Sequence, residues 1–117
     1  MSNKTHRARA SFIEGFEAPK LVDTEVATNV TANLYRILPV NCTAAIRTVT
    51  PPVPTKTGDW FTVVDSRANA NNNNITIDFS SAYKFQGSSA DLNLATAGAY
   101  ATFVWSGSTA VGWLRIA

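Results

Sequence analysis

The sequence predicts an all-β protein: a small antiparallel β-sandwich or barrel-like domain that follows an extended N-terminal arm. Apolar and β-branched residues fall in short runs that have the period of a β-strand. Gly, Pro, Asn and Ser separate these runs at fairly even spacing. Only 15% of the 117 residues are charged, against about 25% in average domains, which favours a β protein or one whose surface is covered by partners.

The length suggests one domain, which we place at residues 22–117, with residues 1–21 as the arm. The arm shows neither the strand nor the helix period, and it has no acidic residue before Glu14. Two interpretations are open, a disordered tail and an arm that docks on a larger partner. We favour the arm, because a tail without a role seldom carries two Phe and an Ile. The residues expected to contact the partner are Lys4, Arg7, Arg9, Phe12, Ile13 and Phe16.

The first half of the domain reads as extended chain. Residues 22–33 fit a strand or connector, and residues 34–40 fit a strand that ends or lies at a sheet edge near Pro39, which has no N–H to donate. A further strand is expected within residues 44–50. The segment Pro51-Pro52-Val53-Pro54 is stiff. It is either a rigid crossover, which we favour, or a proline-rich ligand for a partner.

The centre of the chain, residues 58–79, predicts a hairpin: two strands joined by a loop rich in Asn. The first strand, residues 60–64, is apolar on both faces. We therefore expect both sides of it to be covered, by a second sheet or by another subunit. The second strand, residues 75–79, alternates between apolar and polar residues and should have one wet face.

The last third of the chain predicts strands around residues 92–94, 100–105 and 111–116, the last two forming a terminal hairpin. In residues 100–105, Phe103 and Trp105 lie opposite Tyr100, Thr102 and Val104. About seven strands are expected in all. The large aromatic residues of these strands suit a core or a subunit interface better than a sugar-binding platform. The expected interface residues are Trp60, Phe61, Trp105 and Trp113.

The residues that carry chemistry are few and scattered. The only histidine, His6, lies in the arm, and Cys42 is the only cysteine. Asp59 and Asp65 flank one strand, about 20 Å apart, which is too far for a catalytic carboxylate pair. Asp65 with the Asn-rich loop offers oxygen ligands for calcium, but turn chemistry is the better account. We expect no enzyme, no cofactor and no metal.

The charge balance and hydropathy limit the partners. The formal net charge is +2, which is no strong footprint for nucleic acid, so none is expected. No apolar run approaches the roughly 18 residues of a membrane span. No apolar run follows the basic start as it would in a secretory signal. A nucleic-acid role for the basic arm remains a minor alternative, which a steep salt dependence of binding would reveal.

The string GDWFTVVDSRANANNNNITIDF, with the ending YATFVWSG…VGWLRI, resembles a β-module that recurs in bacteriophage virion proteins. The preceding LYRILPVNCTAAIRTVTPP also resembles the strand pair that comes before that module, so the resemblance covers roughly residues 30–117. One departure is Arg67, where the module often has glycine. The matching residues are Gly58, Asp59, Val63, Asp65, Asn69, Ala70, Asn73, Asn74, Ile75, Thr76, Ile77 and Trp113.

The module occurs in capsid decoration proteins and in head and tail fibres, typically as trimers. The resemblance therefore implies a phage capsid decoration (cement) protein that binds the major capsid protein on the capsid exterior of the virion as a homotrimer. The short chain favours this over a fibre, which needs a shaft and a receptor-binding tip. The alternative is a tail or head-fibre component that binds host-surface glycans.

Overall fold

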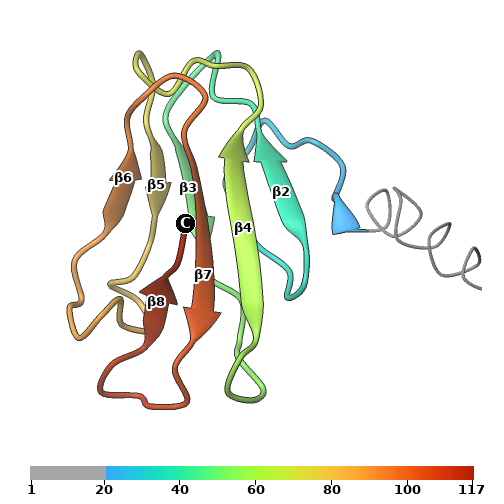
Figure 1. The fold of residues 1–117 in the computed structure, drawn as a ribbon. Coiled ribbons are helices and arrows are strands. Elements are labelled where there is room, and N and C mark those ends of the chain that lie inside the picture. Colours follow the sequence, from blue (N-terminus) through green and yellow to red (C-terminus); the bar gives the residue numbers. More distant parts are fainter. Residues whose placement is uncertain (1–20) are drawn as a thin grey trace, which may run out of the picture.

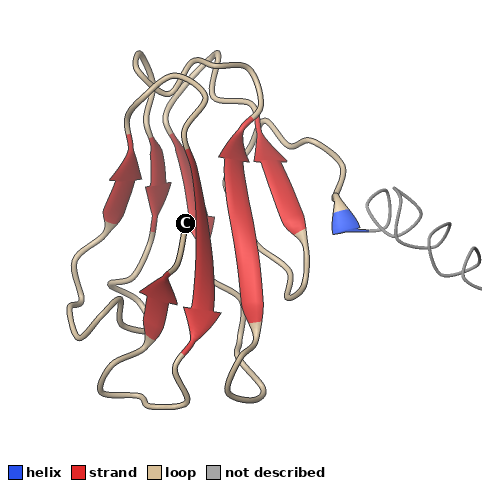
Figure 2. Cartoon of the chain, viewed as in Figure 1, coloured by secondary structure: helices blue, strands red, loops and turns tan. Residues whose placement is uncertain are grey.

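The computed structural model describes residues 21–117, in which eight strands form two four-stranded sheets that enclose one core (Figure 1). The first sheet contains, in spatial order, β1 (Val30–Thr31), β3 (Arg47–Thr50), β5 (Ile75–Ile77) and β6 (Leu92–Leu94). The second contains β2 (Ile37–Val40), β4 (Trp60–Asp65), β7 (Tyr100–Trp105) and β8 (Trp113–Arg115). The all-β prediction is confirmed, and strands and loops account for nearly all of the part drawn in colour (Figure 2). Within residues 21–117 no helix is long and apolar enough to cross a membrane.

The expectation of antiparallel sheets was wrong, because both sheets are mixed. From β1 to β5 the chain changes sheet at every connection. Each crossing reverses the chain direction, so strands that are two apart in sequence lie side by side and run parallel. The parallel pairs are β1 with β3, β3 with β5, and β2 with β4. Antiparallel pairing joins β5 to β6, β4 to β7 and β7 to β8, and the last pair confirms the predicted terminal hairpin.

The predicted central hairpin was also wrong: β4 and β5 lie in different sheets, and residues 66–74 cross between them. The side-chain amides of Asn69 and Asn73 donate hydrogen bonds to the backbone carbonyls of Cys42 and Thr43, at 3.1–3.4 Å. Residues 41–46 form an earlier crossing between the sheets, from β2 to β3. The two crossings are thus bonded to each other, and this contact takes the place of pairing between β4 and β5.

The edge position predicted for the strand with Pro39 is confirmed, because β2 is an outer strand of its sheet. Residues 22–26 run alongside it and pair at two points, Val22 with Ile37 and Val26 with Val40. The amide of Val26 donates to the carbonyl of Pro39 at 3.0 Å. The extended connector predicted at the start of the domain therefore closes this edge of the sheet.

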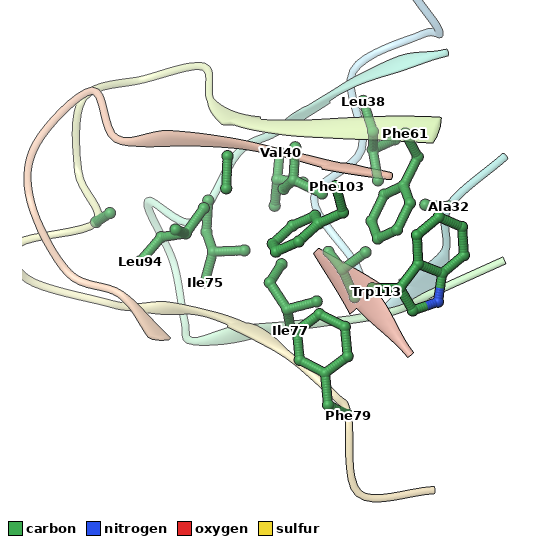
Figure 3. Packing of buried hydrophobic residues seen from close by; sticks show 14 of the residues in the cluster. Ala32, Leu38, Val40, Phe61, Ile75, Ile77, Phe79, Leu94, Phe103 and Trp113 are labelled. Carbon is green, nitrogen blue, oxygen red and sulfur yellow. The ribbon is translucent and has the colours of Figure 1, made fainter. Parts of the chain in front are cut away.

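The core lies between the two sheets and is dominated by aromatic rings (Figure 3). Phe61 of β4 stacks on Phe103 of β7, with 5.0 Å between the ring centroids, and meets Trp113 of β8 edge-on at 4.9 Å. Phe79, which follows β5, reaches Phe103 from the opposite sheet at 5.3 Å. The contact between Phe79 and Phe103 joins the two sheets, so side chains from both layers fill the centre.

Candidate functional site: the outer face of the β2-β4-β7-β8 sheet

Asp59, the first acid of the central stretch, closes the loop that leads into β4. Its side chain has no exposed surface, and one carboxylate oxygen accepts hydrogen bonds from the backbone N–H of Thr55 at 2.6 Å, the hydroxyl of Thr55 at 2.7 Å and the N–H of Lys56 at 3.0 Å. The hydroxyl of Tyr35 donates to the other oxygen. Tyr35 has a φ of 64°, a left-handed conformation that a residue other than glycine adopts where its surroundings hold it. Asp59 therefore joins the start of β4 to the turn before β2.

Asp65 has the corresponding role at the other end of β4. Its carboxylate accepts hydrogen bonds from the backbone N–H groups of Ala70 at 2.8 Å, Gly98 at 2.9 Å and Arg67 at 3.3 Å. The thiol of Cys42 lies 3.7 Å from the same carboxylate. Asp65 thus links the loop after β4 to the turn before β7, which is the turn chemistry expected of it.

The acidic groups of these loops are held in their ionised form. Burial raises the pKa of Asp59, but the hydrogen bonds from Tyr35 and from the Thr55 loop lower it by more, so the pKa lies well below its usual range. Burial likewise raises the pKa of Asp65, and backbone N–H donors bring it below its usual range. The guanidinium of Arg67 donates two hydrogen bonds to Glu25, at 2.8 and 2.9 Å, and this lowers the pKa of Glu25 to about 2. These carboxylates accept hydrogen bonds that close loops. Residues 21–117 contain no group of three or more His, Cys, Asp or Glu side chains that could hold a metal ion.

The side of the β2-β4-β7-β8 sheet that is turned away from the core, which we call the outer face, is apolar. The pairing registers place its residues in three rows across the sheet. None of these residues is charged, and the hydroxyls of Thr62 and Thr102 share a hydrogen bond of 2.7 Å. The outer face consists of Ile37, Pro39, Trp60, Thr62, Val64, Tyr100, Thr102, Val104, Leu114 and Ile116.

Exposed apolar surface is concentrated on this face. Tyr100 is 57% exposed and Ile116 is 65% exposed, while Trp60 at the start of β4 is half-buried. Val22 pairs with Ile37 and extends the middle row of the face by one strand. Among residues 21–117, four of the seven exposed large apolar side chains lie on or beside the outer face, including Leu114. The largest contiguous apolar patch on a protein surface is often functional.

The corresponding face of the other sheet is polar. Thr48 of β3, Thr76 of β5 and Asn93 of β6 form one row across it, and the Thr76 hydroxyl donates to the Asn93 side chain at 2.8 Å. Thr50 and Asp78 continue the same side, while Val49 and Ile77 alternate with them and point into the core. The domain thus has one wet face and one apolar face.

The structure separates the four residues expected at a subunit interface. Only Trp60 lies on the outer face, where its ring meets that of Tyr35 edge-on with 6.4 Å between centroids. Phe61 and Trp113 have no exposed surface, and Trp105 is 8% exposed. A side chain buried within one chain has no surface to offer a second chain, so these three belong to the core.

Sequence reasoning did not single out Tyr100, Leu114 and Ile116 as exposed apolar residues of one face, although the alternation placed them on the correct side of their strands. It grouped Tyr100 with Thr102 and Val104, opposite Phe103 and Trp105. The largest aromatic residues were then assigned to the interface, whereas they bury more area by filling the core. The exposed face was indicated instead by the other set of alternating residues, Tyr100, Thr102 and Val104, whose side chains are smaller on average than those of Phe103 and Trp105.

The six expected contact residues of the arm, Lys4, Arg7, Arg9, Phe12, Ile13 and Phe16, lie outside the described residues, as does His6. The described chain begins at Leu21, and Val22 pairs at once with the edge of the outer-face sheet. The described part of the chain therefore begins at a segment that borders the outer face.

Comparison of the sequence with models of known protein families and with curated proteins finds no match in either.

Proposed function

We propose that this protein is a bacteriophage capsid decoration (cement) protein, whose β domain lies on the outside of the head as a trimer and stabilises the shell. The observation that carries the proposal is the outer face: a small closed sandwich that leaves one whole sheet face apolar is suited to a larger assembly. The resemblance to the phage module supports the same class. Its matching residues Asp59, Asp65, Asn69 and Asn73 hold the loops at the two ends of β4.

The distribution of charge supports a docking role for the arm. Residues 21–117 contain six acidic and six basic residues, so this part of the chain is neutral. Residues 1–20 contain four basic and two acidic residues, so the whole net charge of +2 belongs to them. We propose that Arg7 and Arg9 pair with acidic groups of the major capsid protein, and that Phe12, Ile13 and Phe16 fill apolar grooves in its surface. Opposite charge across a contact contributes to specificity and association rate.

The test measures occupancy on purified phage heads that lack this protein. We expect the full chain to bind and to delay the loss of packaged DNA on heating. A double variant, Arg7→Glu with Arg9→Glu, should bind more weakly, and deletion of residues 1–20 should remove binding. The control is Lys84→Glu, which reverses one exposed charge of the domain. Unchanged occupancy for the arm variants would contradict the arm mechanism, and absence of binding by the full chain would contradict the function.

The alternative, a fibre component that binds host-surface glycans, is favoured by one observation, the exposed ring of Tyr100. Sugar rings stack on exposed aromatic side chains. Binding to a glycan array that Tyr100→Ala abolishes, in a protein that does not bind heads, would favour this alternative over the decoration function.

A further inference from the structure

We infer that the outer face is the surface through which copies of this chain pack against one another. The occupant of the face is thus a second copy of the same chain. The inference rests on the proposed trimer and specifies where its subunits meet. The sequence placed Phe61, Trp105 and Trp113 at the subunit interface, but these three lie in the core. The inference assigns the interface to surface residues instead, of which Tyr100, Leu114 and Ile116 are the most exposed on the outer face.

The size of the face suits a second face like itself. From the strand that contains Val22 to β8 there are four strand intervals, about 19 Å at the usual spacing of about 4.8 Å. Along the strands, the row that contains Pro39 and the row that contains Trp60 lie four residues apart, about 13 Å. With side chains projecting beyond these limits, the face covers roughly 500 Å². Two such faces in direct contact bury roughly 1,000 Å² in total, which is the minimum expected of a biological interface.

The charges around the face also fit a second copy. The face has no charged side chain, and the described part of the chain is neutral, so two copies meet without repulsion. The nearby arginines already have partners: Arg115 donates to the backbone carbonyl of Tyr100 at 3.0 Å, and Arg36 lies 3.5 Å from the carboxylate of Asp23. A charged partner would find no complement here, whereas an equally apolar surface would.

Both edges of the β2-β4-β7-β8 sheet are covered, which favours contact between copies through its outer face rather than through its edges. On the side of β8, the N–H of Trp113 donates to Lys84 at 2.8 Å, and the N–H of Gln86 donates to Trp113 at 2.9 Å. On the side of β2, residues 22–26 cover the edge. Strand addition between copies would have to displace one of these segments, whereas contact between faces requires no rearrangement.

The test is the mass of the full chain in solution, measured by sedimentation and light scattering at rising concentration. For the wild type we expect a mass above that of one chain: twice it when two outer faces meet directly, or three times it when three outer faces gather around a three-fold axis. The double variant Tyr100→Lys with Ile116→Lys should dissociate, with a dissociation constant raised at least about tenfold, because each copy would bury unpaired charge. Both positions are largely exposed, so the variant should fold, and circular dichroism checks this. The matched control is Ile46→Lys with Val53→Lys, at sites 57% and 68% exposed that are not part of the outer face.

The outcomes separate this inference from the proposed function. A wild-type protein that stays a single chain at every concentration would overturn the inference, while binding of heads by the arm could still stand. An oligomer that survives in the Tyr100 and Ile116 variant would overturn the inference and leave the trimer. A dimer lost in that variant would support the face as the contact and correct the number of subunits.

Discussion

Gly112 provides a sharp test of how β8 is held in the sandwich. Its φ is +81°, and a Cβ atom placed there would lie 1.9 Å from the backbone oxygen of Lys84 and 2.4 Å from its carbonyl carbon. That carbonyl accepts the hydrogen bond from Trp113, the first residue of β8. Gly112→Ala therefore cannot be accommodated unless the segment from Lys84 to Gly87 moves away from β8.

The expected loss of stability has two parts. An alanine in the left-handed region costs about 1–2 kcal/mol. Moving the segment breaks the hydrogen bonds that Trp113 makes with Lys84 and Gln86, each contributing about 1 kcal/mol, and it disturbs the packing of Phe85. The sum is about 4 kcal/mol. At about 4–8 °C per kcal/mol, this lowers the midpoint of thermal unfolding by roughly 16 °C or more.

Gly98 is the matched control for this substitution. Its φ is +75°, but an added Cβ would find nothing within 4 Å. Gly98→Ala should therefore show the backbone cost alone, about 1–2 kcal/mol. Both variants are compared with the wild type by thermal and urea unfolding, followed by tryptophan fluorescence at one fixed protein concentration. Equal losses for the two variants would refute the idea that the Lys84 segment clamps β8.

Two further predictions concern the carboxylates that accept hydrogen bonds within the domain. Asp59→Asn should lower the urea midpoint more than Asp78→Asn. Asp59 is buried and accepts four hydrogen bonds, whereas Asp78 accepts hydrogen bonds from Ser80, two residues along the chain. Equal shifts of the midpoint would contradict the role given to Asp59. The free energy of unfolding should also fall in acid. The pKa values of Asp59, Asp65 and Glu25 are lower in the folded chain than in the unfolded chain, so these ionised groups stabilise the fold fully above about pH 4.5. Their contribution is lost as the pH falls, for Glu25 down to about pH 2. Urea titrations from pH 7 to acid check this, and a midpoint that does not change would show that these groups are not coupled to folding.

The strands could be predicted because their cause is local. In β7 the alternation of Phe103 and Trp105 with Thr102 and Val104 is visible in the chain itself, and the structure keeps these two sets on opposite faces. The pattern did not say which set faces the core. In β4 both sets are apolar, and only packing against the second sheet places Phe61 inside and leaves Trp60 outside.

The chain's own residues thus determine that the protein is all-β, where its main strands lie and that its net charge belongs to residues 1–20. The tertiary structure decides which sheet each strand joins and which apolar face stays open. The physical reason is that a hairpin and a crossing between sheets use the same turn residues. Which of the two is formed therefore depends on hydrogen bonds to residues far away in the sequence. Here the partners are the amides of Asn69 and Asn73, which bond to the carbonyls of Cys42 and Thr43 some 30 residues earlier.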